Sequence, residues 1–169
     1  MTQERYHNYI LRRIKEESKL QTFSLKWDER FMRLAEQIST WSKDPSTKVG
    51  AIIVNEERRI LATGYNGFPR GIEDTEERLN NREEKYPRII HAELNALMNA
   101  LYNGVSVKDS TLYVYGLPVC SECTKSVIQA GIKRVVIPSM KGVPEKWADS
   151  WNNVSAPMYE EAGVEVFII

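Results

Sequence analysis

Two short patterns in the sequence bring together residue types that can bind a metal and move protons. His91 and Glu93 form H-x-E, and Cys120 and Cys123 form C-x-x-C. One imidazole and two thiolates make a zinc site with three protein ligands, and catalytic zinc sites of this kind keep the fourth position open for water. Apart from His7, the chain has no other histidine or cysteine that could close the site. The sequence therefore predicts a catalytic rather than a structural zinc site.

Glu93 is predicted to move protons and not to bind the metal. It lies two residues from His91, so the two side chains do not share one face of a regular helix. From the first turn of a helix, however, its carboxylate can reach a metal-bound water, whose pKa zinc lowers to about 7. A carboxylate there can take a proton from the water and pass protons to a ring nitrogen and to a departing amine.

The combination of H-x-E with C-x-x-C is the pattern of zinc-dependent deaminases of nucleobases. That pattern places a proline directly before the first cysteine, whereas here Val119 separates Pro118 from Cys120. Two other classes of function stay open. A non-catalytic, zinc-stabilised binding module would not need Glu93, and a thiol redox pair would cycle Cys120 and Cys123 to a disulfide without metal.

The composition favours a soluble enzyme of one main domain that acts on a small molecule. The chain has 169 residues, and its 23 basic and 23 acidic side chains cancel. Proteins that follow a nucleic-acid polymer usually carry a basic excess, so no such partner is expected. The sequence has neither an apolar stretch of about 20 residues nor a secretion signal at its start, which favours a cytoplasmic location.

The patterns around the motifs predict an α/β fold, with a hairpin followed by alternating helices and strands. His91 and Cys120 would each begin a helix, where the partial positive charge of the N-terminus favours a thiolate. Asp28 is a plausible N-cap of the first helix, and the charged segment 71–90 is expected to be irregular, as an ordered insertion or a lid. The expected helices cover 28–41, 91–103, 121–130 and 146–162, and the expected strands cover 49–54, 60–64, 111–115, 134–137 and 164–168.

Over most of residues 26–169, the sequence resembles the deoxycytidylate (dCMP) deaminases of the cytidine deaminase superfamily. The segment GYNGFPRG at 64–71 together with HAELNALMN at 91–99 is more particular to these enzymes than the zinc residues are. The other matching segments are SKDP at 42–45, VGA at 49–51, KYP at 85–87, CSEC at 120–123 and IQAGIKRVV at 128–136. Residues 1–25 match nothing in the family and are expected to be an extension, with a polar helix over 3–20.

The resemblance implies a three-layer α/β/α sandwich with a mixed central sheet and hydrolysis of dCMP to dUMP. Another cytosine nucleotide, such as dCTP or a 5-modified dCMP, or a nucleoside stays open as the substrate. Members of the family are typically homo-oligomers, often hexamers. Several are activated by dCTP and inhibited by dTTP. Mg²⁺ is a further expected cofactor, bound together with such a regulatory nucleotide. Because 71–90 holds no histidine or cysteine, one zinc ion per chain is predicted.

The resemblance also assigns roles to single positions. His91, Cys120 and Cys123 match the zinc ligands, and Glu93 matches the catalytic acid and base. Asn66 matches an asparagine near the sugar, and the backbone of Ala92 lies where the family reads the polar edge of the ring.

Four further residues are candidates for substrate contacts. Arg70, Ser42 and Lys43 could bind phosphate, since guanidinium suits phosphate oxygens and the other two lie on a turn. Trp147, with Trp151 as the alternative, could stack on the base in place of a tyrosine that some family members use. In each case a purely structural role is the alternative: solvated loop or turn residues for the first three, helix packing for Trp147, and turn stabilisation for Asn66.

Overall fold

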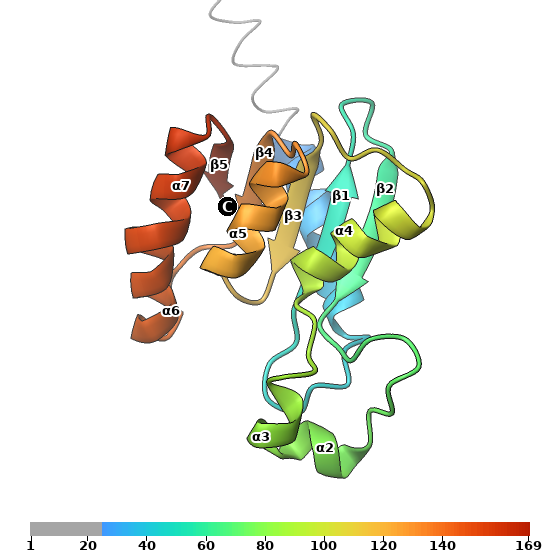
Figure 1. Cartoon of the computed structure of the whole chain (residues 1–169). Helices are drawn as coiled ribbons and strands as arrows, with labels where there is room; N and C mark the ends of the chain where they lie inside the picture. The colour runs from blue at the N-terminus through green and yellow to red at the C-terminus, as the bar shows by residue number, and fades with distance from the viewer. Residues whose placement is uncertain (1–24) are drawn as a thin grey trace, which may run out of the picture. The chain divides into compact units, whose positions relative to one another are not determined.

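The computed structural model describes residues 25–169 (Figure 1). The chain divides into two compact units, residues 1–30 and 31–169. In the first unit, the described residues 25–30 are helical. The polar helix predicted over 3–20 lies outside the described residues. The second unit contains the five strands of the sheet.

A mixed sheet of five strands forms the centre of this unit, as the sequence predicted. The strands lie in the order β2-β1-β3-β4-β5. β1 is antiparallel to both β2 and β3, whereas β4 is parallel to β3 and β5 is parallel to β4. The strands are β1 (Gly50–Val54), β2 (Ile60–Tyr65), β3 (Thr111–Tyr115), β4 (Arg134–Ile137) and β5 (Glu165–Ile168).

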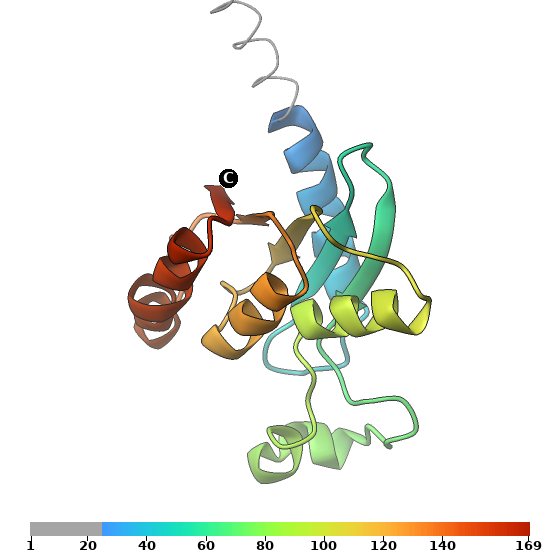
Figure 2. The same ribbon diagram turned by 45° about the horizontal axis from the view of Figure 1, so that its top comes forward.

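Helices cover both faces of the sheet, which confirms the three-layer α/β/α arrangement (Figures 1 and 2). Residues 31–39 are helical and cover one face, where the ring of Phe31 lies 5.2 Å from that of Tyr113. On the other face lie α4 (Ala92–Tyr102), α5 (Ser121–Gln129) and α7 (Ala156–Glu161). All five residues of β1 are buried, because a strand covered on both faces has no solvated side.

Both predicted ends of the helix over 28–41 were wrong. Asp28 does not begin a helix, since the described chain is already helical from residue 25, and this helix ends at residue 39 instead of 41. At its end, the hydroxyls of Ser39 and Thr40 donate to the carbonyls of Glu36 and Gln37 at 2.6 Å each. Such bonds from side chain to backbone compete with further helical bonds and favour termination.

The charged segment 71–90 is more regular than predicted, because it contains α2 (Glu76–Asn80) and α3 (Arg82–Lys85). The side chain of Thr75 accepts a hydrogen bond from the backbone of Arg78, and that of Asn81 accepts one from Glu83. These two N-caps, each followed by acidic residues, make short helices possible in a polar sequence.

The single helix predicted over 146–162 is a helical run of three segments, two α-helical and one π-helical. α6 (Glu145–Ser150) and α7 flank η1 (Trp151–Ser155), a π-helical turn. Within it, Trp151 is buried and its ring centre lies 6.0 Å from that of Tyr159. Among the described residues, no helix combines the length and the apolar character required to span a bilayer.

Candidate active site

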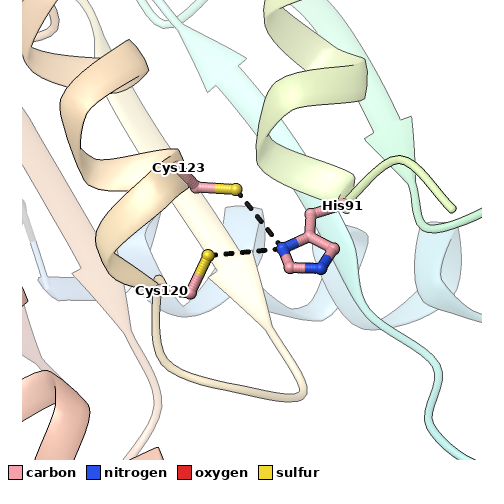
Figure 3. Close-up of side chains that lie close together, drawn as sticks. All are labelled: His91, Cys120 and Cys123. Atoms are coloured by element: carbon pink, nitrogen blue, oxygen red, sulfur yellow. Dashed lines mark hydrogen bonds between the residues drawn. The ribbon is translucent and has the colours of Figure 1, made fainter. Parts of the chain in front are cut away.

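The N-termini of α4 and α5 place three metal-binding side chains together. His91 is the N-cap residue of α4, Cys120 is that of α5, and Cys123 follows in the first turn of α5. The Nδ1 atom of His91 lies 3.3 Å from the sulfur of Cys120 and 3.5 Å from that of Cys123 (Figure 3). The three ligand atoms all lie within 4.8 Å of one another, and both cysteines are free thiols.

Contacts between α4 and β2 fix the start of α4. Gly64 lies so close to the helix that a Cβ atom there would fall 2.3 Å from the backbone nitrogen of Ala96. The amide groups of Asn95 and Asn99 donate to the carbonyls of Tyr65 and Thr63, each at 2.8 Å. β2 is an edge strand, so these amides also satisfy carbonyls that no neighbouring strand can reach.

The donor set fits a zinc ion. Hydrogen bonds from Cys123 and His91 lower the pKa of Cys120 to about 4, and the shared hydrogen bond raises the pKa of Cys123. The two sulfurs thus compete for one proton, which a divalent cation would replace while neutralising both thiolates. An imidazole and two thiolates leave one tetrahedral position open, as in catalytic zinc sites.

Glu93 lies in the first turn of α4 and is almost fully buried. It lines the same cavity, of about 160 Å³, as His91 and Cys120. Burial disfavours the charged carboxylate and raises the pKa of Glu93 to about 7, although its own backbone hydrogen bond and the charge of His91 oppose the shift. A carboxyl group with such a pKa can both accept and release a proton near neutral pH.

Comparisons with known proteins agree with this geometry. The family model described as "Cytidine and deoxycytidylate deaminase zinc-binding region" matches residues 25–139. The chain belongs to this family. Proteins named deoxycytidylate deaminase from Mus musculus and Homo sapiens are 44% and 43% identical to it, and each match covers 83% of this chain and 78% of the relative.

A solved structure supports the same fold. The crystal structure of the dCMP deaminase from cyanophage S-TIM5 in complex with dCMP and dUMP is 30% identical in sequence, with a TM-score of 0.66. The match covers 83% of this chain and 95% of the phage chain. The fold of this unit is therefore that of the cytidine deaminase family, as the resemblance implied.

Three of the predicted substrate-binding residues line the cavity that holds Glu93: Asn66, Ala92 and Trp147. The amide of Asn66 is engaged with the backbone, since its Oδ1 accepts from the nitrogen of Val49 at 2.8 Å and its Nδ2 donates to the carbonyl of Thr47 at 2.9 Å. It therefore shapes the cavity wall and retains one amide hydrogen for a ligand.

Two other predicted residues, Ser42 and Lys43, are not among those that line the cavity. The hydroxyl of Ser42 donates to the carbonyl of Asn66 at 2.7 Å, so this buried residue supports the wall from behind. Lys43 pairs with Asp74 at 2.9 Å. Both roles are structural in this conformation, and phosphate binding by these residues stays a prediction.

Arg70 also lies away from the cavity-lining set. Its guanidinium donates to the side chain of Asn99 at 2.5 Å and covers the ring of Tyr102 at 4.8 Å, on the exposed side of α4. Because Arg70 does not line the cavity of its own chain, its contact with the substrate stays a prediction.

Sequence reasoning missed a buried ion pair in the cavity wall. Lys85 and Asp44 both line the cavity and are both about 5% exposed, and the Nζ atom of Lys85 lies 3.1 Å from Asp44 Oδ1. Lysine is seldom buried, and 41 positions separate the partners, so no local pattern indicates the pair. The one available signal was that both residues belong to segments shared with the dCMP deaminases, SKDP and KYP.

Proposed function

We propose that this protein is a zinc-dependent hydrolase that converts dCMP and water to dUMP and ammonia. The observation that carries the proposal is the cluster of His91, Cys120 and Cys123, of which His91 and Cys120 line one cavity together with the buried Glu93. Its relatives named deoxycytidylate deaminase and its structural neighbour with bound dCMP and dUMP support dCMP as the substrate.

His91, Cys120 and Cys123 would hold the metal, with Nδ1 as the imidazole ligand because it faces both sulfurs. A zinc ion held there would supply a water of lowered pKa. Glu93 would accept one proton from that water as the oxygen adds to C4 of the base, and would deliver it to ring atom N3. It would then carry the remaining proton of the added hydroxyl to the leaving amino group, so that ammonia departs as the carbonyl of dUMP forms.

The remaining cavity residues would orient the base and the sugar. The backbone of Ala92 can meet the polar edge of the ring, Asn66 can offer its remaining amide hydrogen to the sugar, and Trp147 can cover the base. In this proposal the deaminase domain comprises residues 26–169, and residues 1–25 are an extension to it. The family match, which begins at residue 25, supports that division.

Assembly and regulation follow from membership of the family alone. We expect a homo-oligomer, with a hexamer as the form to test, and activation by dCTP and inhibition by dTTP with Mg²⁺ as their companion. Analytical ultracentrifugation of the zinc-loaded protein tests the assembly, and initial rates of dCMP deamination with and without each nucleotide test the regulation. One species of monomer mass and unchanged rates under all conditions would contradict them.

A substrate panel tests the function itself. Ammonia release is measured from dCMP, dCTP, 5-methyl-dCMP and deoxycytidine, alongside the zinc content of the purified protein. We expect dCMP to give the highest kcat/KM with about one zinc ion per chain. Turnover of another compound without turnover of dCMP would overturn the substrate, and zinc binding without any turnover would favour a binding module.

A further inference from the structure

The phosphate group of a nucleotide substrate needs a positive partner in the cavity. A phosphate monoester carries between one and two negative charges near pH 7, and its oxygens accept strong hydrogen bonds. The charged residues that line the cavity are Asp44, Lys85, His91 and Glu93. His91 faces the two sulfurs and would be a metal ligand, so among these described residues Lys85 is the permanent cation.

Lys85 retains hydrogen-bonding capacity although it is buried. Its Nζ atom donates to Asp44 Oδ1 at 3.1 Å and to the hydroxyl of Ser46 at 3.3 Å. An ammonium group has three hydrogens, so these two bonds to described residues leave one for a ligand. The two bonds also hold the ammonium in place before a ligand arrives.

The loop that faces Lys85 contributes two hydroxyl groups and one carboxylate, that of Asp44. Asp44 Oδ1 accepts from the backbone nitrogens of Ser46 at 2.8 Å and Thr47 at 3.2 Å, as well as from Lys85. The carboxylate is therefore engaged in holding this turn together. Because the oxygen of Ser46 accepts the bond from Lys85, its own proton is free to be donated to a phosphate oxygen.

A purely structural role explains this pair poorly. Burying an ion pair costs desolvation that its Coulomb attraction barely repays, so such pairs are weak stabilisers. Here the pair lies in the wall of the cavity that also holds Glu93 and Cys120. The burial of a charged group in the wall of a binding cavity is better explained by a charged ligand that binds there.

We propose that Lys85, together with the hydroxyl of Ser46, binds the 5′-phosphate of the substrate and makes the enzyme select nucleotides over nucleosides. This inference rests on the proposed deaminase function. It assigns the selection to the side of the cavity that comes from residues 44–47 and the end of α3, apart from the residues that would hold zinc.

Paired substrates separate phosphate binding from a structural role. In Lys85→Met, kcat/KM for dCMP should fall about 10- to 100-fold, the loss expected for a hydrogen bond between charged groups, while kcat/KM for deoxycytidine changes less than about 3-fold. Lys85→Arg should recover part of the loss for dCMP. Equal losses for both substrates, or an unchanged kcat/KM for dCMP, would overturn the inference.

Binding of the product gives a readout that does not depend on turnover. In titration calorimetry of the zinc-loaded protein, Lys85→Met should weaken the binding of dUMP about 10-fold or more and leave the binding of deoxyuridine nearly unchanged. Lys133→Met is the matched control, because this exposed lysine pairs with Glu56 and does not line the cavity. This variant should bind dUMP and deoxyuridine as tightly as the protein without substitutions does.

A milder variant keeps the inference testable if Lys85→Met does not fold. Ser46→Ala leaves the ion pair in place and removes the hydroxyl, so it should reduce kcat/KM for dCMP several-fold without affecting deoxycytidine. If both substrates respond equally, the hydroxyl does not bind phosphate. If the protein without substitutions deaminates neither substrate, the deaminase function is contradicted. If it deaminates both substrates equally well, only the phosphate site is contradicted.

Discussion

The two sides of the cavity are built in different ways. The metal side consists of His91, Glu93, Cys120 and Cys123, which lie at or near the starts of two helices that pack on the sheet. The loop side consists of residues 44–47 in a turn, of Asn66 directly after β2, and of Lys85 at the end of a four-residue helix. Bonds between distant positions hold it together.

This difference separates reaction chemistry from substrate selection. The metal side depends on the two helix starts, whose spacing brings the donors together, so its geometry follows from the packing of α4 and α5. The geometry of the loop side depends on side chains that form hydrogen bonds with the backbone of distant residues. The Oδ1 atom of Asn66, for example, accepts from the backbone nitrogen of Val49. Changes on the metal side should therefore abolish turnover, whereas changes on the loop side should alter affinity and selectivity.

The largest effect is expected from removing a metal ligand. Cys123→Ser should lose most of its zinc, and its turnover of dCMP should fall more than about 1,000-fold, because zinc lowers the pKa of water from about 16 to about 7. Elemental analysis and ammonia release measure the two quantities. Ser126→Ala, in the same helix, is the control. Full activity of the serine variant with one zinc ion per chain would show that Cys123 is not a ligand.

The next largest effect should come from the packing that positions the metal side. Gly64→Ala would place a methyl group 2.3 Å from the backbone nitrogen of Ala96, so α4 must shift. We expect a loss of about 3 kcal/mol in the free energy of unfolding, measured by urea denaturation. Gly67→Ala is the matched control, since a Cβ there meets only the ring of Tyr65, at 3.7 Å, and should cost much less. Equal losses in both variants would mean that the close approach of α4 is unimportant.

A smaller effect is expected on the loop side. Asn66→Ala removes two hydrogen bonds to the backbone, to Val49 and Thr47, and leaves buried groups without partners. The free energy of unfolding should fall by about 2 kcal/mol, and KM for dCMP should rise more than kcat falls. A large fall in kcat with unchanged KM in the alanine variant would place Asn66 with the metal side.

The sequence indicated the metal side almost completely, for a physical reason. Helix and strand patterns follow from local periodicity, so strands 111–115 and 134–137 were predicted with the ends observed. Once His91 and Cys120 were expected to begin helices, their spacing to Glu93 and Cys123 was enough to indicate the chemistry.

The loop side could not be predicted in the same way, because its contacts join residues far apart in the chain. The pair of Lys85 with Asp44 spans 41 positions, and no local pattern reports such a contact. Arg70 and Lys43 illustrate the converse: their residue types suit phosphate, yet the structure pairs them with Asn99 and Asp74 instead. Residue type alone does not indicate which cation faces the cavity.

The most direct test of the account is Glu93→Gln in the zinc-loaded protein, because the amide keeps the shape of the side chain but cannot take a proton. We predict that zinc stays at about one ion per chain, that dUMP still binds, and that kcat for dCMP falls about 100- to 10,000-fold. A variant that keeps its zinc and deaminates dCMP within about 3-fold of the original rate would contradict the role of Glu93 in moving protons.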